Sequence, residues 1–399
     1  MNDQSPGLAR WPALAVALSP QAESIRQQAK DFADAEIVPF ADSIERTGEF
    51  PPDLWPKMGN AHLLGLTVPT QYGGAGLGYL EHLVAHEEIS RASPAVGFSY
   101  LVHSHACVNQ IFLHGSQAQR LRFLPPLISG RAFGALAMTE KEAGSDVFSM
   151  ATLAVRQDGG YRLDGSKAWI CNAARADIVV VYARSSATDR KLSAFVIDRD
   201  VPGFHASAAK QTLGMRGSGT ADITLTACNL GEDTLLGRWN EGAAILLGGL
   251  NLERFVAAGG PLGLMQACLE IATDYARTRH QFGHPLGSFQ LIQGRLAGMV
   301  ATVNAARAYA YAVGAAIASK HALSFDSTAL LLFLGDAAHR VASDTVQILG
   351  AAGYDDTSLA ARLLRDSKFF SIGYGATEIR QIVVGRELMK GPQDLEVRP

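Results

Sequence analysis

The apolar residues of this 399-residue chain change their spacing twice along the sequence. From about residue 21 they recur every three or four residues, which is typical of amphipathic helices. Between about 131 and 240 they gather in short runs bounded by turns, as in a sandwich or barrel. From about 241 the helical spacing returns. The pattern predicts an α+β chain with an N-terminal helical domain at 1–130, a middle β domain at 131–240 and a C-terminal helical domain at 241–399.

The individual elements follow from the same spacing. Helices are expected at residues 21–44, 59–68, 79–92, 120–129, 249–270, 297–318 and 328–349. Strands are expected at residues 133–138, 151–157, 161–170, 177–184, 192–198 and 221–228. Residues 1–20 are expected to form a loose arm. The helices at 297–318 and 328–349 are apolar on more than one face, which favours burial, including at a subunit interface.

Charge and cysteine content exclude several classes of protein. The formal net charge is −3 and no long basic run occurs, so nucleic acid is not expected as a partner. The four cysteines lie far apart without a C-x-x-C pair, which argues against a zinc site and favours a reducing compartment. No uninterrupted apolar run has the length of a membrane span, and the N-terminus is a poor signal or transit peptide. We therefore expect a cytoplasmic protein without a membrane span, with a processed organellar form as the alternative.

Two polar patterns are similar to ligand sites but fail on their spacing. His82 and His86 lie four residues apart, and the stretch HEEIS at 86–90 lacks the final histidine of a zinc protease motif. We expect these histidines on a solvated helix face, with no metal bound. The glycine-rich stretch at 72–78 lacks both the spacing and the lysine of a phosphate loop.

A glutamate heads the apolar helix predicted at 249–270. Glu253 is surrounded by leucine, phenylalanine, valine and alanine, with Arg254 as its nearest charged neighbour. Burial disfavours the charged form of a carboxyl group and raises its pKa, which suits a general base near neutral pH. The alternative is a core helix in which Glu253 only pairs with Arg254 or another neighbour. Pro261, inside the same pattern, predicts a local kink.

The sequence LNLERFVAAGGPLGLMQACLE at 250–270 resembles the helix that carries the catalytic glutamate in the isovaleryl branch of the acyl-CoA dehydrogenase family. The likeness runs from about residue 20 to about 390. AMTEKEAGSD at 137–146, with Ser149, resembles the first diagnostic pattern of the family without a mismatch. The second pattern, at 347–366, departs from the family at Ala351 and Thr357. The resemblance implies a C-terminal four-helix bundle and FAD as the cofactor.

The resemblance also implies which residues bind the cofactor and the substrate. For FAD it implies contacts from Leu136, Ala137, Met138, Thr139, Ser145, Trp169, Ile170, Cys171, Arg279, Gln290, Gln347, Ile348, Leu349, Gly350, Ala351, Ala376, Thr377 and Glu378. For the substrate it implies contacts from Ser145, Tyr182, Ala183, Ala244, Asn251, Leu252, Arg254, Tyr374 and Gly375. It implies no metal.

The implied reaction is α,β-dehydrogenation of an acyl thioester. Glu253 would remove the α-proton while the β-hydrogen leaves as a hydride for flavin N5. Most members of the family carry the base in a C-terminal loop, but the matching loop at 371–379, SIGYGATEI, has Tyr374 instead. The isovaleryl branch has its glutamate on the helix, which agrees with Glu253. The resemblance further implies that the backbone N–H of Tyr374 binds the thioester carbonyl.

The predicted acyl pocket departs from the isovaleryl pattern. Ala244 replaces a tyrosine, Asn251 an aspartate and Tyr374 a small residue, which predicts a displaced pocket. We expect a short or branched-chain acyl-CoA as substrate, an electron-transfer flavoprotein as electron acceptor and a homotetramer as the assembly. The alternatives are the same reaction on an acyl or peptidyl carrier protein, a flavin-dependent oxidase or monooxygenase, and a non-catalytic acyl-CoA binder of the same fold.

Overall fold

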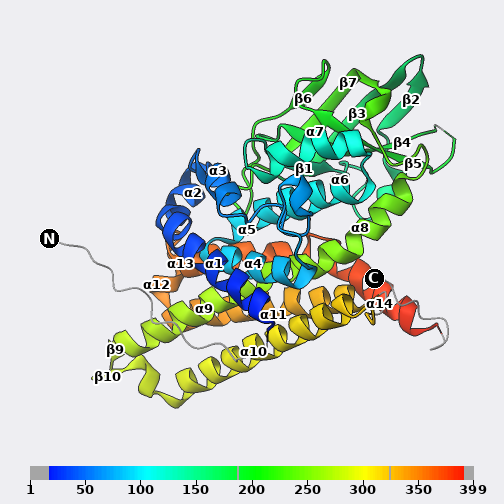
Figure 1. The fold of residues 1–399 in the computed structure, drawn as a ribbon. Coiled ribbons are helices and arrows are strands. Elements are labelled where there is room, and N and C mark those ends of the chain that lie inside the picture. Colours follow the sequence, from blue (N-terminus) through cyan, green and yellow to red (C-terminus); the bar gives the residue numbers. More distant parts are fainter. Residues whose placement is uncertain (1–17, 187, 323–324, 391–399) are drawn as a thin grey trace.

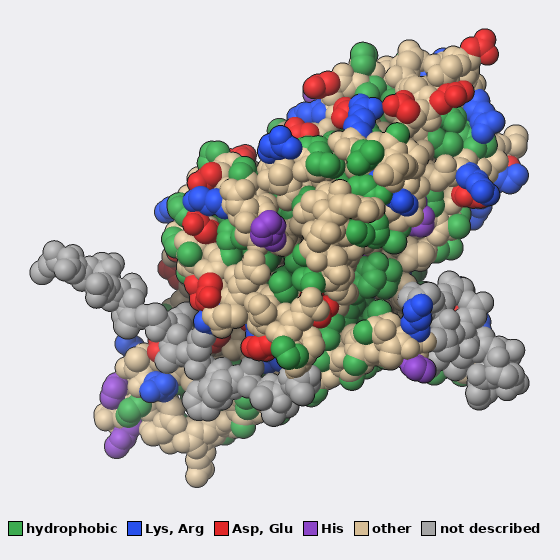
Figure 2. Space-filling view, in the orientation of Figure 1, with side chains coloured by type: hydrophobic (Ala, Val, Ile, Leu, Met, Phe, Trp, Pro, Cys, Tyr) green, Lys and Arg blue, Asp and Glu red, His purple; other side chains and the backbone are tan. Residues whose placement is uncertain are grey.

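The structure is a computed structural model that describes residues 18–186, 188–322 and 325–390. A β domain lies at one end of a layer of long helices, with the N-terminal helices beside both (Figure 1). The arm expected at 1–20 lies almost entirely outside the described residues. Charged side chains of both signs are mixed over the β domain on the face drawn in Figure 2, in keeping with the small net charge.

The N-terminal part is helical. Its helices are α1 Pro20–Glu36, α2 Ala41–Thr47, α3 Leu54–Asn60, α4 Tyr79–Ala92, α5 Pro94–Leu101, α6 Val108–His114 and α7 Gln117–Ile128. Helix α4 has the predicted bounds. The helix predicted at 21–44 is interrupted, because Pro39 lies in a 3-10 turn and provides no backbone N–H. The helix predicted at 59–68 is wrong, because His62 and Gly65 have φ angles of 51° and 71°, which a right-handed helix excludes.

Helix α4 is covered on opposite sides by α1 and by α9 (Gly259–Thr278). The contact with α9 is close, since a Cβ on Gly259 or Gly263 would lie only 2.6 or 2.2 Å from a carbonyl oxygen of α4. His82 and His86 are therefore buried, with 0% and 1% of their surface exposed. The predicted solvated face is wrong, because α4 has partners all round. No group of three His, Cys, Asp or Glu side chains in the described residues is arranged to hold a metal ion.

The buried charges between α4 and the C-terminal helices are paired. Glu87 accepts hydrogen bonds from Arg307 Nε at 2.9 Å and from Tyr311 Oη at 2.7 Å. Arg307 also donates to Gln266 Oε1 at 2.9 Å. Burial acts to raise the pKa of Glu87, but Arg307 and then Arg26 outweigh it and hold this pKa below its ordinary value. The carboxylate is thus stable in its charged form inside the protein.

The middle part folds into one eight-stranded sheet. Its strands are β1 Gly134–Ala137, β2 Leu153–Gln157, β3 Gly160–Ile170, β4 Ile178–Arg184, β5 Leu192–Asp198, β6 Phe204–Ala206, β7 Ala221–Gly231 and β8 Leu235–Leu236. The order is β6-β7-β3-β2-β4-β5-β8, with β1 also beside β4. Strands β1 and β2 run parallel to β4, and the other pairs are antiparallel. Each predicted strand is present. The two faces of the sheet pack in separate apolar cores.

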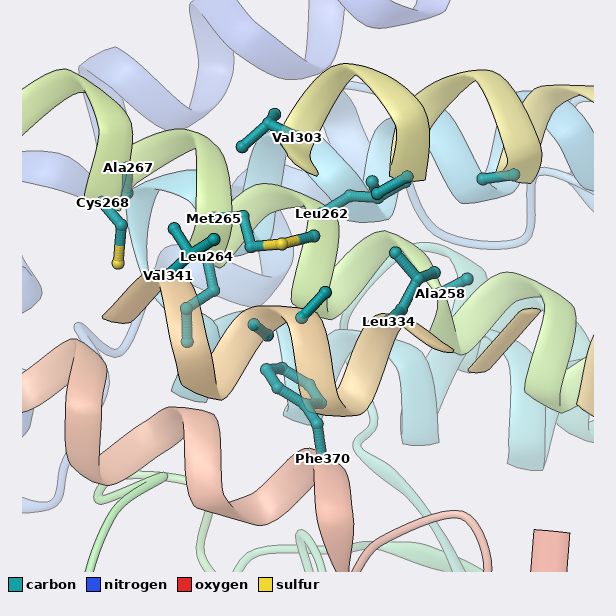
Figure 3. Close-up of a cluster of buried hydrophobic side chains, with 14 of the residues drawn as sticks. Ala258, Leu262, Leu264, Met265, Ala267, Cys268, Val303, Leu334, Val341 and Phe370 are labelled. Atoms are coloured by element: carbon teal, nitrogen blue, oxygen red, sulfur yellow. The ribbon is translucent and has the colours of Figure 1, made fainter. Parts of the chain in front are cut away.

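The C-terminal part is again helical. Its elements are α8 Gly242–Ala257, α9, the hairpin of β9 His280–Gln281 and β10 His284–Pro285, α10 Gln290–Ala318, α11 Asp326–Leu349, α12 Ala351–Tyr354, α13 Leu359–Ser367 and α14 Thr377–Leu388. Helices α9, α10 and α11 pack along one another (Figure 1). Figure 3 shows Leu262, Met265, Val303, Leu334 and Phe370 meeting in their shared core. Helical ends around a middle sheet confirm the predicted α+β architecture.

The single helix predicted at 249–270 is divided at Ala258 into α8 and α9. Pro261 has no backbone N–H for the carbonyl four residues before it, so the helical hydrogen bonds break where the sequence predicted a kink. Glu253 therefore lies about one turn before the end of α8, not at the head of a helix. Gly242–Thr278 is long and apolar enough to cross a membrane by composition, but 94% of its most apolar window is buried within the fold.

Candidate functional site

Glu253 lies near the end of α8 among mostly apolar neighbours. It is half-buried, and no group in the described part of the chain donates a hydrogen bond to its carboxylate. Burial raises the pKa of Glu253 to about 7, and the Arg254 guanidinium opposes this rise only in part. The carboxyl group therefore exchanges a proton near neutral pH, which is the property of a general base.

Tyr374 comes from the loop between α13 and α14. Its ring meets Phe98 and Phe369 edge-on, at centroid distances of 5.9 and 5.4 Å. Its Oη is buried and has no hydrogen-bond partner among the described residues. The φ angle of Tyr374 is 58°, which is rare for a bulky side chain and marks a backbone held by its surroundings.

The same loop meets α8 beside Glu253. Arg254 Nε donates to the carbonyl oxygen of Tyr374 at 3.4 Å, and a Cβ on Gly375 would lie 3.5 Å from Arg254 Nη2. Burial raises the pKa of the Tyr374 phenol well above its ordinary value, and the nearby Cys171 and Glu253 raise it further. The structure thus brings together four predicted site residues from two segments that are more than 100 residues apart.

Strand β1 leads into the signature stretch at 137–149. Leu136 and Met138 pack towards the core shared with α6, α7 and α8, whereas Ala137 points into the sheet's other core. The carbonyl of Thr139 accepts a hydrogen bond from Ala168 N at 2.9 Å. Ser145 is exposed in the turn that follows.

A buried ion pair beneath this stretch was not predicted. Lys167 Nζ lies 2.8 Å from Glu140 Oε1 and donates to the Met138 carbonyl at 3.2 Å. Glu140 also accepts the backbone N–H groups of Ala151 and Thr152, at 2.5 and 3.0 Å. The ion pair therefore holds the start of the signature stretch, at Met138, and the residues that follow its end, Ala151 and Thr152. Its only sequence signal was the glutamate of the diagnostic pattern, since Lys167 is 27 residues away.

The end of β3 presents a flat aromatic surface. Trp169 is 59% exposed, with a φ angle of 62°, and its backbone N–H donates to Asp222 Oδ1 at 3.1 Å. Ile170 and Cys171 are buried behind it. Burial raises the pKa of Cys171 to about 12, so its thiol stays protonated near neutral pH. An exposed indole beside polar backbone groups fits an aromatic ring with a polar edge, such as a flavin.

The predicted substrate contacts on β4 point to opposite faces of the sheet. Tyr182 is buried in the core shared with α8, where its Oη donates to Gln110 Oε1 and lies near Glu253. Ala183 is buried in the other core. Only the backbone of Ala183 therefore remains available on the Glu253 side.

Of three further predicted contacts on α8, Ala244 lies apart from Asn251 and Leu252. Ala244 is exposed and lies nine residues before Glu253, which is half a revolution round the helix and roughly 13 Å along it. The structure does not bring Ala244 to Glu253. Asn251 and Leu252 are half-buried, and Asn251 Oδ1 has no hydrogen-bond partner in the described chain.

A hollow of about 360 Å³ lies between the end of α9 and the end of α11. It brings together Arg279, from the end of α9, and residues 348–351 of the stretch 347–351 that was expected to contact FAD. Gly350 has φ 60° and ψ −135°, and a Cβ built there meets nothing within 4 Å. The Gly350 N–H donates to the Val346 carbonyl at 2.9 Å, so the free donors here are the Arg279 guanidinium and the N–H groups of Ala351 and Ala352, which have no acceptor in the described chain. Phosphate oxygens require such donors. This part of the site therefore fits the diphosphate of FAD.

The remaining predicted cofactor contacts lie at helix ends. Gln290 and Gln347 are exposed, at the start of α10 and near the end of α11, and neither lines the hollow. Ala376 precedes α14, whose first residue Thr377 donates from Oγ1 to the Ser371 carbonyl at 3.2 Å. Glu378 is exposed in the first turn of α14. In the single chain Gln290, Gln347 and Glu378 are therefore open to solvent, whereas Ala376 and Thr377 are half-buried.

Known proteins match the chain along almost its entire length. Three family models match it: the acyl-CoA dehydrogenase N-terminal domain at residues 19–131, the middle domain at 135–228 and the C-terminal domain at 240–389. A mitochondrial isovaleryl-CoA dehydrogenase of Oryza sativa is 44% identical, with 92% of this chain and 91% of the relative covered. A mitochondrial 2-methylacyl-CoA dehydrogenase of Solanum tuberosum is also 44% identical, over 92% of this chain and 90% of the relative.

Solved structures share the fold. The butyryl-CoA dehydrogenase of Megasphaera elsdenii superposes with a TM-score of 0.91 at 29% identity, covering 94% of this chain and 100% of that one. A glutaryl-CoA dehydrogenase of Mycobacterium smegmatis, solved in complex with FADH2, gives 0.89 at 26% identity, over 93% and 95% of the two chains. The chain belongs to the acyl-CoA dehydrogenases, FAD-dependent oxidoreductases that act on the carbon–carbon bond of acyl-CoA thioesters.

Proposed function

We propose that the chain converts a short or branched-chain acyl-CoA, similar to isovaleryl-CoA, to the 2-enoyl-CoA with Glu253 as the α-proton base. The observation that carries this proposal is a half-buried carboxyl group with a pKa of about 7 and no hydrogen-bond donor from the described chain. The names of the relatives, isovaleryl-CoA and 2-methylacyl-CoA dehydrogenase, support a branched substrate.

The chain's own groups divide the work between base and carbonyl. Glu253 takes the α-proton, and the electron pair of that C–H bond moves towards the thioester carbonyl. The backbone N–H of Tyr374 has no acceptor among the described residues, so it is available to that carbonyl oxygen. A donor aimed at the developing oxyanion stabilises the transition state more than the bound substrate. Bound FAD supplies, at its N5, the acceptor for the hydride that leaves the β-carbon.

We also propose how the chain holds FAD and assembles. Arg279 and the turn at 348–351 would bind the diphosphate, and Leu136 to Thr139 with Trp169 would line the ring. An apolar hollow of about 200 Å³ between α9 and α10, together with Leu291 at 86% exposure, supports contacts with further subunits. A homotetramer that passes electrons to an electron-transfer flavoprotein is the proposed state. Sedimentation velocity of the purified protein measures the assembly.

The substrate is tested by anaerobic bleaching of the flavin. The panel contains straight and branched C4 to C8 acyl-CoAs and isovaleryl groups carried on acyl carrier protein. We expect the C4 and C5 acyl-CoAs to bleach fastest, with the carrier-bound group slower. If only the carrier-bound group bleached the flavin, the substrate would be an acyl group on a carrier protein and not an acyl-CoA. If no thioester bleached the flavin, the proposed activity would be refuted.

The cofactor site is tested by Arg279→Ala. Hydrogen bonds to charged groups contribute about 1.5–3 kcal/mol, so the variant should bind FAD roughly ten- to a hundredfold more weakly. The ratio of flavin absorbance to protein, measured through dialysis, follows the loss. Arg277→Ala removes an exposed arginine two residues away and serves as the matched control. Equal FAD retention in both variants would exclude Arg279 from the cofactor site.

A further inference from the structure

Three successive carbonyl groups of the Tyr374 loop are held by guanidinium groups. Arg380 Nη2 donates to the Gly373 carbonyl at 3.2 Å, and Arg380 Nε donates to the Gly375 carbonyl at 2.7 Å. Arg254 Nε takes the carbonyl between them, that of Tyr374, at 3.4 Å. The loop backbone is therefore fixed on both sides of Tyr374 without any regular secondary structure.

Arg380 is an unusual residue for such a contact. It is 0% exposed, and no carboxylate of the described chain lies within ion-pairing distance of it. Burial lowers its pKa to about 10, although Asp336 and Glu378 act from further away to raise it. Its remaining bonds go to the carbonyls of Leu331 in α11, at 2.8 Å, and of Phe370. A buried charge without a counter-ion costs several kcal/mol unless its hydrogen bonds are satisfied. Here four backbone carbonyls, three of them between Phe370 and Gly375, satisfy that requirement.

Because the peptide bond is planar, the direction of the Gly373 carbonyl also determines the direction of the Tyr374 N–H. In a trans peptide the C=O and the following N–H point to opposite sides. Because the Gly373 carbonyl points at Arg380, the N–H of Tyr374 points away from Arg380. This N–H has no acceptor among the described residues. The left-handed φ of 58° at Tyr374 is unfavourable for an aromatic residue, so the loop needs such a clamp to keep it.

We propose that Arg380 is a positioning residue for the reaction: its grip on the Gly373 and Gly375 carbonyls aims the Tyr374 N–H at the thioester carbonyl. This inference rests on the proposed function, in which Glu253 takes the α-proton and the carbonyl oxygen gains charge. Arg380 is fully buried, and its hydrogen bonds within the described chain all go to backbone carbonyls. It acts only through the peptide between Gly373 and Tyr374.

The test follows polarisation of a bound carbonyl instead of turnover. Pivaloyl-CoA has the C5 branched shape but no α-hydrogen, so it binds without reacting. We expect the infrared band of its thioester carbonyl, assigned with a ¹³C label, to shift to lower frequency on binding to the holoenzyme. Arg380→Lys keeps the charge but replaces the planar fork by a single ammonium group, which cannot hold the same carbonyls. The shift should shrink by at least about half, and kcat should fall roughly tenfold or more, within the effect of an oxyanion donor.

A matched variant separates positioning from stability. Arg307→Lys makes the same change at another buried arginine, which holds Glu87 and Gln266 instead of the loop. It should lower the unfolding temperature but leave the infrared shift of bound pivaloyl-CoA unchanged. If Arg380→Lys does not fold, Arg380→Gln, whose neutral amide still donates two hydrogen bonds, replaces it in the same measurement. An infrared shift in the Arg380 variant equal to that of the wild type overturns the inference.

The outcome is distinguishable from failure of the proposed base. Glu253→Gln removes the proton acceptor and should leave the infrared shift intact. A normal shift in Glu253→Gln with normal flavin reduction would refute the base while leaving the role of Arg380 standing. A lost shift in Arg380→Lys, with slow reduction in Glu253→Gln, supports both.

Discussion

Two glutamates on adjacent helices of this protein, the buried Glu87 and the half-buried Glu253, have opposite surroundings. Glu87 on α4 accepts hydrogen bonds from Arg307 and Tyr311, and its pKa is held below the ordinary value. Glu253 on α8 accepts none from the described chain, and burial raises its pKa to about 7. Burial alone therefore does not decide the charge of a carboxyl group here. The number of hydrogen-bond donors around the carboxyl group decides its charge, and the candidate site is the place where the chain provides no such donor.

The largest effect expected from this contrast is on the rate of Glu253→Gln. The amide keeps the shape of the side chain but cannot accept the α-proton. Flavin reduction by isovaleryl-CoA should slow by roughly 10²–10⁴-fold or more, with FAD content and ligand binding retained. Anaerobic stopped-flow absorbance measures the rate. Glu241→Gln, at the exposed start of the same helix, is the control, and unchanged kinetics in Glu253→Gln would falsify the assignment.

The same substitution at Glu87 should affect stability and not chemistry. Glu87→Gln leaves Arg307 as a buried charge without a counter-ion, and breaking such a pair costs about 3–5 kcal/mol. Urea unfolding of the FAD-bound protein measures the loss. Glu253→Gln removes a carboxylate that has no hydrogen-bonded partner, so its free energy of unfolding should stay equal or rise. A comparable loss in both variants would show that the two environments do not differ as described.

The two carboxyl groups should also give opposite dependences on pH. The pKa of Glu253 rises on folding from 4.5 to about 7, so its contribution to stability is full below 4.5 and is lost as pH rises through 7. The pKa of Glu87 is lowered, so its contribution is present above 4.5 and is lost as pH falls through the folded value. The free energy of unfolding in urea should be measured at several pH values. In Glu253→Gln it should no longer fall as the pH rises towards 7, and in Glu87→Gln it should no longer fall as the pH becomes acidic.

Catalysis should follow the first of these titrations. Because Glu253 must be ionised in the free enzyme, kcat/KM should rise with pH to a plateau, and the midpoint of this rise should lie near pH 7. The residual rate of Glu253→Gln should lack this limb. A profile that is flat from pH 5 to 9 in the wild type would place the base elsewhere.

The sequence predicted the regular parts of the fold because their patterns are local. Strand 192–198 and helix α4 have the predicted bounds, since turns and caps mark their ends. Two failures are local, because Pro39 interrupts the helix predicted at 21–44 and the positive φ angles of His62 and Gly65 exclude the helix predicted at 59–68. The failure at the histidines concerns contacts between distant segments. The burial of His82 and His86 depends on α1 and α9 covering α4 from opposite sides, which no spacing within α4 reveals.

The site was predictable where a motif carried it and not where long-range bonds complete it. Glu253 and its raised pKa followed from apolar neighbours in the same helix. The partners of Glu87 and Glu140 did not, because Arg307 is 220 residues from Glu87 and Lys167 is 27 residues from Glu140. Arg380 was likewise missed, since backbone carbonyls as partners leave no trace in the side-chain pattern.

The smallest expected effect is on substrate selectivity, and it depends on which residues lie on the same side of α8 as Glu253. The sequence hypothesis paired Tyr374 with Ala244 as two walls of one pocket. In the structure Tyr374 lies beside Glu253, whereas Ala244 is exposed on the opposite side of the helix. Tyr374→Ala should therefore relax selectivity towards bulkier acyl groups by a factor of ten or a few tens, because a pocket difference of one methylene is worth about 1–3 kcal/mol.

Ala244→Tyr should leave the order of substrates unchanged, since the new ring would project into solvent away from the base. The measurement is kcat/KM over straight and branched C4 to C8 acyl-CoAs for the wild type and both variants. A new preference in Ala244→Tyr would return that residue to the pocket wall and contradict its placement on α8. An unchanged order in Tyr374→Ala would mean that its ring, although packed between Phe98 and Phe369, does not bound the acyl group.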